Sequence, residues 1–382
     1  MVNTWTKKKL GDIAEIRMCK RIFAEQTTVS GDIPFYKIGT FGKEPDAYIS
    51  STIYDEFKSK YSFPSKGDIL LSAAGTLGRT VIYDGKPAYF QDSNIVWLEI
   101  DESQICNKYL NHCYQVMVWA SPEGSTISRL YNGIIRDTDI KLPPLPEQRE
   151  IAATLSDAYD YITALERLIA KKRAIKQGAM QELLTGKRRL LGFCSEWVSF
   201  ELERVADMYD NLRVPITESL RESGQIPYYG ANGIQDYVKG YTHDGEFVLI
   251  AEDGANDLSN YPVRYVKGRI WVNNHAHVLQ GKTEKADTQF LAYAMSMLDY
   301  QAILVGGTRA KLNGSVLKKI MVSLPDNDEQ TAIAALLSDM DAEIDILNAK
   351  LEKVRRIKQG MMSELLTGRI RLIKEEMENG KN

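Results

Sequence analysis

The sequence predicts an α+β protein. Two mixed globular domains, each a sheet with helices, are expected to be joined by two long antiparallel coiled-coil helices in an internal two-fold repeat. Three observations support this prediction: one long segment occurs twice, both copies carry apolar residues at coiled-coil spacing, and a strand-rich segment precedes each copy. The expected globular domains are residues 1–142 and 191–324, and the expected helical regions are residues 143–190 and 325–377.

The composition is that of an ordinary globular protein. The 382 residues include 26% charged and 44% hydrophobic residues, which favours two or three folded domains over a disordered or fibrous chain. A net charge of -3 argues against a uniformly basic surface, although local basic faces remain compatible with it. The four cysteines lack zinc-like spacing, and neither an apolar leader nor a membrane-length apolar run is present, so we expect a cytoplasmic protein without a membrane partner.

The repeat relates residues 143–190 to residues 325–372. Roughly half of the aligned positions are identical, far more than two unrelated helices would share. The stretch Glu182 to Gly186 matches Glu364 to Gly368 without a mismatch, and Glu147-Gln148 matches Glu329-Gln330. The chain therefore contains the same helical unit twice.

Each copy is predicted to be a long helix with recognisable ends. Pro146 and Asp326-Asn327 are helix start signals, and Gly186 and Gly368 are left-handed stop signals. About 40 helical residues would form a rod of roughly 60 Å. The helices either pair within one chain or join two chains. The expected seam residues are Ile151, Leu155, Ala158, Ile162, Leu165 and Ile169 in the first copy, and Ile333, Leu337, Met340, Ile344, Leu347, Leu351 and Val354 in the second.

The two globular segments share a framework but differ in their loops. Gly67 to Leu71 corresponds to Gly245 to Leu249, and both are typical of buried strands. The loops that follow, residues 73–79 and 251–256, have different polar residues. Similar helices with divergent loops are expected if the helices perform one task and each domain recognises something different, although loops also diverge without functional cause.

The sequence contains little that indicates catalysis. Gly281-Lys282-Thr283 resembles the end of a P-loop, but Ala276 stands where the leading glycine is required. His275 and His277 lack a third metal ligand at a suitable spacing, so surface or core histidines are the favoured interpretation. The Asn/Asp-Pro-Pro-aromatic motif of adenine methyltransferases is absent. We therefore expect a non-enzymatic chain without catalytic or metal-binding residues.

Polar side chains suited to nucleic acid are common in the loops. Arg and Lys can read guanine, Asn can read adenine, and all of them can bind phosphate, although each one singly is an ordinary surface residue. The candidate DNA-binding residues are Arg17, Lys20, Arg21, Lys37, Thr76, Arg79, Asn94, Arg129, Tyr131 and Asn132 in the first domain, and Arg213, Tyr229, Asn232, Asn256, Asn274, Arg309, Lys311 and Asn313 in the second.

Together, these motifs resemble those of the specificity subunit of type I restriction-modification systems over essentially the whole chain. The resemblance rests on residues 142–152 and 324–334, in which a proline is followed by Glu-Gln and a heptad helix, and on the paired Glu-Leu-Leu-Thr-Gly. Gly67 to Leu71, and Gly307-Thr308 ahead of Leu312-Asn313, also resemble the family's target-recognition domains. The second entry loop departs from the pattern, since Asp326 to Asp328 replace prolines and a leucine.

The resemblance implies a DNA-binding subunit that is not itself an enzyme. Each target-recognition domain would read one half of a bipartite duplex target, while the helices separate the halves and dock two DNA adenine methyltransferase subunits. The chain itself would hold no cofactor, and S-adenosylmethionine, ATP and Mg²⁺ would belong to the methyltransferase and restriction subunits. The alternatives are a structural coiled-coil adaptor whose globular ends bind proteins, and a fused or solitary enzyme subunit, which the missing motifs disfavour.

Overall fold

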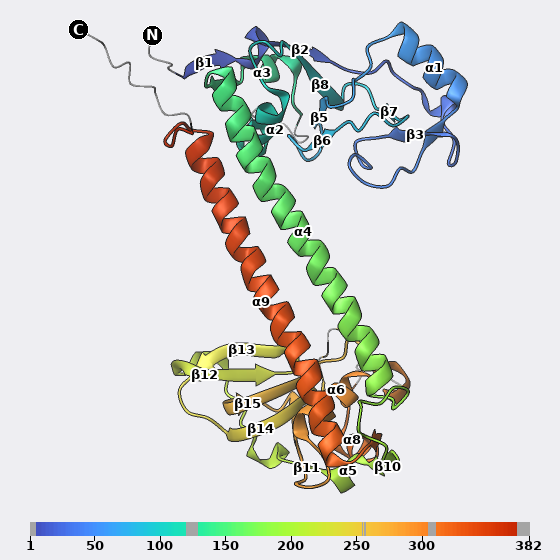
Figure 1. Cartoon of the computed structure of the whole chain (residues 1–382), viewed down its shortest axis with the longest axis vertical. Coiled ribbons are helices and arrows are strands. Elements are labelled where there is room, and N and C mark those ends of the chain that lie inside the picture. Colours follow the sequence, from blue (N-terminus) through green and yellow to red (C-terminus); the bar gives the residue numbers. More distant parts are fainter. Residues whose placement is uncertain (1–4, 120–128, 254, 256, 305–310, 373–382) are drawn as a thin grey trace, which may run out of the picture. The chain divides into compact units, whose positions relative to one another are not determined.

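The computed structural model describes residues 5–119, 129–253, 255, 257–304 and 311–372. The chain forms two compact units (Figure 1). The first unit combines residues 1–165 with residues 350–382, and the second comprises residues 166–349. Each unit therefore contains one globular domain together with part of each long helix, α4 (Leu145–Leu183) and α9 (Asn327–Leu365). Among the described residues, no helix is long and apolar enough to cross a bilayer.

The first unit is built on a four-stranded antiparallel sheet with the order β2-β8-β5-β6. A second, three-stranded sheet has the order β4-β3-β7, and β1 pairs with β9. The strands are β1 (Thr6–Lys9), β2 (Ala14–Arg17), β3 (Ile33–Tyr36), β4 (Tyr48–Ile49), β5 (Ile69–Ser72), β6 (Thr80–Ile82), β7 (Tyr89–Phe90), β8 (Ile95–Ile100) and β9 (Asp139–Leu142). The helices of this domain are α1 (Ser51–Lys60), α2 (Asn107–Val116) and α3 (Asn132–Asp137).

The second unit is built on a six-stranded sheet with the order β11-β16-β14-β15-β12-β13, beside which β10 pairs with β17. The strands are β10 (Val198–Glu201), β11 (Ala206–Met208), β12 (Ser223–Gly230), β13 (Gly233–Val238), β14 (His243–Ala251), β15 (Val263–Val272), β16 (Ala276–Gly281) and β17 (Met321–Leu324). The helices are α5 (Leu202–Val205), α6 (Thr288–Ser296), α7 (Tyr300–Ile303) and α8 (Gly314–Lys318). The expected mixed α+β class is confirmed in both units.

The two long helices pair with each other, antiparallel, inside each unit. In the first unit, Ile151 and Leu155 of α4 share a buried cluster with Met362 and Leu365 of α9. Ile162, Leu165 and Leu351 are buried as well. In the second unit, the buried seam residues are Ile169, Ile333, Leu337 and Ile344. Long helices with heptad seams are therefore confirmed, and the pairing seen is the intramolecular one.

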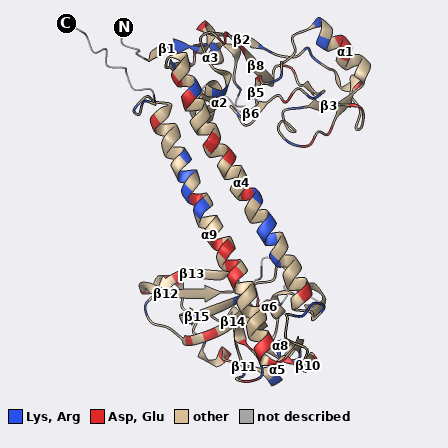
Figure 2. Cartoon of the chain, viewed as in Figure 1, with Lys and Arg blue, Asp and Glu red and all other residues tan. Residues whose placement is uncertain are grey.

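Charge supports this antiparallel pairing. In the second unit, α4 carries a basic stretch that faces an acidic stretch of α9, and Lys172 and Lys176 pair with Glu343 and Asp341 at 2.7 and 2.5 Å. In the first unit the signs are reversed, because α4 is acidic near its start and α9 is basic near its end (Figure 2). A parallel arrangement would bring like charges together along both helices.

The repeated glutamate of each helix start forms a buried ion pair. Glu147 is 0% exposed and accepts two hydrogen bonds of 2.7 Å from Arg371, which follows the end of α9. Glu329 is likewise 0% exposed and accepts from Arg189, which follows the end of α4. A bidentate arginine–carboxylate pair fixes both distance and orientation. Each unit therefore fastens the start of one helix to the end of the other.

The neighbouring glutamine fastens the globular domain to the same place. Gln148 accepts from the backbone of Cys106 at the start of α2 and donates to the carbonyls of Gln104 and Pro143. Gln330 repeats all three bonds with Asp287, Lys285 and Pro325. Both side chains are buried, so their full bonding satisfies groups that would otherwise be costly. The Glu-Gln motif is thus the point where domain and helices meet.

The glycine stop of each helix is required by its backbone and by its neighbour. Gly186 and Gly368 have φ of 68° and 75°, the left-handed region that favours glycine. A Cβ added at Gly186 would lie 3.2 Å from Trp197, and one added at Gly368 would lie 3.1 Å from Trp5. The predicted stop signals are confirmed, and the tryptophan at the start of each domain covers one of them.

Candidate nucleic-acid interface

In the first unit, three loops meet at one edge of the central sheet. The loop after β5 bonds to the residues before β8 through Ala73 N and Asn94 O at 2.8 Å. The residues before α3 join the same edge, because Leu130 N donates to Ala73 O at 2.8 Å. Five of the candidate DNA-binding residues lie on these loops, namely Thr76, Arg79, Asn94, Arg129 and Tyr131.

The second unit repeats this arrangement. Glu252 N, after β14, donates to His275 O at 2.9 Å, and Leu312 N donates to Glu252 O at 2.7 Å. The match with the first unit aligns Ala73 with Glu252, Asn94 with His275 and Leu130 with Leu312. Leu71 therefore corresponds to Ile250, so the predicted match with Leu249 was wrong by one residue. This edge carries the candidates Arg213, Asn274, Lys311 and Asn313. The two units therefore present equivalent loop edges with different side chains.

Exposure separates the candidates at these edges. Thr76, Asn274, Lys311 and Asn313 are exposed. Tyr131 is 56% exposed, and the guanidinium of Arg129 lies 5.9 Å from the centre of its ring. A cation held over an exposed aromatic ring can contact both phosphate and base.

Several other candidates of the first domain are engaged in ion pairs or ring contacts. Arg17 pairs with Glu15 and Glu99, Arg21 with Asp92, and Lys37 with Asp46. The ammonium of Lys20 lies 5.3 Å from the centre of the Tyr61 ring. Asn132 is exposed at the start of α3. Surface ion pairs are weak, so DNA phosphates can compete for these cations.

Arg79 has an internal role in addition to any contact with DNA. Its Nη2 donates to the carbonyl of Ile38 at 3.0 Å, and its guanidinium lies 5.3 Å from the centre of the Phe41 ring. Arg79 thus connects the loop after β5 to the segment after β3. Sequence reasoning found the residue but not this bond, which joins positions far apart in the chain.

The remaining candidates of the second domain are dispersed. Tyr229 lies on β12, and its carbonyl accepts from Asn273 N at 3.0 Å, which places it next to Asn274. Asn232 occupies the turn between β12 and β13, where its carbonyl accepts from Arg264. Asn256 and Arg309 lie outside the described residues.

Sequence reasoning missed a charged cluster beside Arg213. Asp210, Glu252 and His277 each place a side-chain oxygen or nitrogen atom within 4.8 Å of the others, a spacing that could fit a metal ion. Arg213 pairs with Asp210 at 3.2 Å and with Glu252 at 2.7 Å, and Lys311 pairs with Glu252 at 3.1 Å. The chain's own cations thus already compensate both carboxylates. The sequence feature that could have indicated this cluster is His277, a histidine at a core-facing position of a predicted strand.

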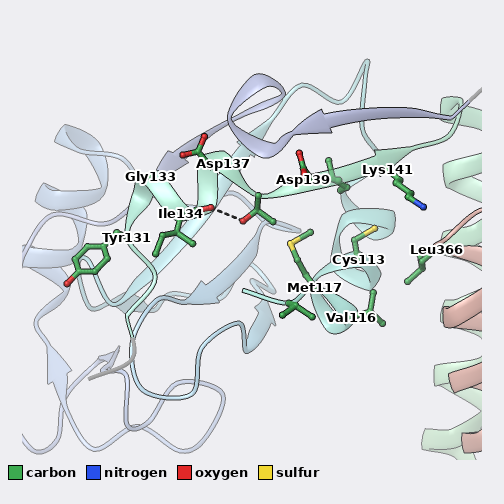
Figure 3. Close-up of a pocket in the computed structure, with 13 residues that line it drawn as sticks. Cys113, Val116, Met117, Tyr131, Gly133, Ile134, Asp137, Asp139, Lys141 and Leu366 are labelled. Atoms are coloured by element: carbon green, nitrogen blue, oxygen red, sulfur yellow. Dashed lines mark hydrogen bonds between the residues drawn. The ribbon is translucent and has the colours of Figure 1, made fainter. Parts of the chain in front are cut away.

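A separate hollow of about 800 Å³ lies in the first unit (Figure 3). Its wall includes Cys113, Val116 and Met117 from α2 and the residue after it, together with Leu366. Tyr131 is the one candidate residue among the lining side chains that the structure describes. The hollow is therefore mostly distinct from the loop edge.

A family model supplies the identity of this arrangement. The model described as "Type I restriction modification DNA specificity domain" matches residues 3–177 and 194–356, which is most of the chain in two copies. The chain belongs to this family. As a type I specificity subunit, it has a role in DNA sequence specificity.

Relatives and solved structures agree. A putative type I restriction enzyme specificity subunit from Haemophilus influenzae is 57% identical over 155 residues, covering 41% of this chain and 40% of that protein. The putative MjaX specificity subunit of Methanocaldococcus jannaschii is 26% identical, covering 96% of this chain and 94% of its own. The crystal structure of the type I S subunit from M. genitalium has the same fold, with a TM-score of 0.69 at 17% identity, covering 95% and 96% of the two chains.

Proposed function

We propose that each globular domain of this specificity subunit reads one half of a bipartite duplex DNA target. The observation that carries the proposal is the pair of equivalent loop edges, which share backbone bonds yet differ in side chains. A shared frame places each edge in the same way, while different Arg, Lys and Asn side chains can select different bases. One chain can thereby recognise two unlike half-targets.

The paired helices serve a common purpose in both units. We propose that they set the unread gap between the half-targets and dock two DNA adenine methyltransferase subunits. In support, Ile175 and Ile357 occupy matching positions in the repeat and are 48% and 49% exposed. A repeated exposed apolar residue beside an identical Lys-Gln-Gly suits two copies of one partner.

The catalytic chemistry is assigned to the partners. S-adenosylmethionine would belong to the methyltransferase subunits, while ATP and Mg²⁺ would belong to restriction subunits that associate in the cytoplasm. The specificity subunit would contribute target selection and spacing. A coiled-coil adaptor with protein-binding ends remains the competing proposal, and it requires no sequence preference for DNA.

A methylation map tests the proposal. The full chain is expressed with its modification subunit in a host, and modified adenines are mapped across the genome. We expect a bipartite motif. When residues 1–142 are exchanged for the corresponding domain of another specificity subunit, one half of the motif should change and the other should persist. A change in both halves would contradict separate reading, and binding without any sequence preference would favour the adaptor.

A further inference from the structure

The charged cluster of the second unit occupies a place that the first unit fills with apolar side chains. The matching backbone bonds align Glu252 with Ala73, and two residues further along the strand they align His277 with Val96. Ala73 and Val96 are each 1% exposed and form part of the first unit's core. The same fold therefore forms without these charges. A buried charge network is often no more stable than apolar packing, so stability alone does not account for the cluster.

His277 is at the centre of the cluster. It is 2% exposed, and its two ring nitrogens contact two acceptors, Asp210 Oδ2 at 2.5 Å and the carbonyl of Leu312 at 2.7 Å. Burial raises the pKa of Asp210, but the hydrogen bonds from His277 and the Val278 backbone and the charges of His277 and Arg213 lower it overall, so this carboxylate is ionised. Neither an ionised carboxylate nor a carbonyl can donate a hydrogen bond. Both nitrogens must therefore carry hydrogen, which makes the ring an imidazolium cation.

The surrounding charges favour that cation. Burial lowers the pKa of His277, but the hydrogen bonds with Asp210 and the Leu312 carbonyl, together with the charges of Asp210 and Glu252, outweigh it and raise the pKa above its ordinary value. Arg213 and Lys311 also face the cluster and neutralise part of its negative charge. His243, on β14, contacts the carbonyl of Tyr209 through its Nε2 at 3.1 Å.

The two acceptors belong to separate segments of the loop edge. Asp210 begins the short turn Asp210–Leu212, which leads directly to Arg213. Leu312 is fully buried between the exposed residues Lys311 and Asn313. One side chain thus connects two segments that carry three candidate DNA-binding residues. These segments lie about a hundred residues apart in the sequence, so local structure alone cannot hold them together.

We propose that His277 is a positioning residue for DNA reading by the second domain, joining the segment that carries Arg213 to the segment that carries Lys311 and Asn313. The inference rests on the proposed function and adds to it the residue that orders one of the two reading edges. When His277 loses its proton, one of its nitrogens becomes an acceptor facing an acceptor. One of the two hydrogen bonds is then lost, and the segment that it held is fixed less firmly, although the Leu312 N–Glu252 O bond and the Arg213 and Lys311 ion pairs remain.

The inference predicts that the two half-targets respond differently to pH. As pH rises through the pKa of His277, discrimination at the second half-target should fall. Discrimination at the first half-target should not change with pH in this way, since the corresponding residue, Val96, does not titrate. Both halves are read by the same complex on the same duplex, so the first half serves as an internal control for the pH dependence of methylation itself.

The experiment measures initial methylation rates of the complete complex on duplexes that are matched, mismatched in the second half, or mismatched in the first half. The matched-to-mismatched ratio for each half is followed across pH in the wild type and in His277→Val, the first unit's counterpart. His277→Val removes both hydrogen bonds, so it should lower the second-half ratio by at least about tenfold, the size of one charge-assisted hydrogen bond, and remove its pH dependence. The first-half ratio should be unchanged.

The Asp210→Asn variant tests whether the pH profile of second-half discrimination shifts, which it would not do if His277 had only a structural role. The amide preserves an acceptor for His277 but removes the negative charge, so the fall in second-half discrimination should shift to lower pH. An unchanged second-half ratio and pH profile in His277→Val, or an equal loss in both halves, would overturn the inference. Wild-type methylation without sequence preference would instead contradict the proposed function.

Discussion

In both units the globular domain contacts the long helices through the same Glu-Gln motif, but the residues around the motif differ. Alignment of the motif places Tyr293 of α6 at the position of His112 of α2. In the second unit, Tyr293 donates to Asp341 at 2.7 Å, and Asp341 also pairs with Lys176. In the first unit the corresponding positions hold His112, Tyr159 and Lys358, with no carboxylate among them. The repeated contacts define the joint, while the residues around it can vary.

This difference has an electrostatic consequence. Burial, followed by the charge of Lys358, lowers the pKa of His112. Its Nε2 lies 3.2 Å from Ser156 Oγ, a contact that offers no charge to balance an imidazolium. Burial also lowers the pKa of Lys358. Protonation of His112 would therefore destabilise the domain–helix junction of the first unit. The junction of the second unit contains Asp341, an acid that can compensate a cation.

Breaking the buried ion pair should have the largest effect. Arg371→Met leaves the Glu147 carboxylate buried without its partner, and we expect the first unit to lose about 2 to 4 kcal/mol of unfolding free energy. Hydrogen exchange resolved by unit would measure this loss. Arg189→Met should destabilise the second unit instead. Equal loosening of both units by either variant would show that the two joints are not independent.

Removing the glutamine should have the next largest effect. Gln148→Leu deprives one backbone donor and two carbonyls of their partner, at a cost of about 1 to 3 kcal/mol. Gln330→Leu should cost a similar amount in the second unit, because its bonds are the same. Denaturant unfolding, with the two units followed by separate probes, checks both values. A much smaller cost in one unit would mean that water replaces the side chain there.

Acid should lower the stability of the first unit by a smaller amount. Because the folded-state pKa of His112 is lowered, the unfolded chain takes up the proton first, so this contribution is complete above about pH 6.5 and is lost as pH falls below it. His112→Tyr, the second unit's residue, should remove the loss. Unit-resolved exchange between neutral and mildly acidic pH is the measurement. An acid loss in the first unit that persists in His112→Tyr would show that another group is responsible.

Exchanging a surface charge pair should have the smallest effect. Lys172→Glu alone places two acids together between α4 and α9, and it should cost below about 1 kcal/mol, falling as salt is added. The double exchange with Glu343→Lys should restore stability. A cost that is insensitive to salt would show that the residue contributes by packing rather than by charge.

Much of the fold was predictable because its signals are local. The heptad spacing of Ile333, Leu337 and Ile344 indicates a helix seam, and Gly186 and Gly368 mark helix ends through their own backbone requirement. The repeat also indicated that the chain has two equivalent parts. The candidate site was predictable only by residue type. Arg79 and Arg213 were found as candidates, but their bonds to Ile38 and Glu252 depend on distant segments.

The sequence by itself therefore determined the repeat, the two helices with their seams and ends, and the kinship with type I specificity subunits. Only the tertiary structure decided that Glu147 meets Arg371, 224 residues away, and that His277 joins Asp210 to Leu312. The physical reason is the distance along the chain over which each interaction acts. Helix periodicity and turn chemistry act between near neighbours, whereas a buried charge acquires its partner only when folding brings remote segments together.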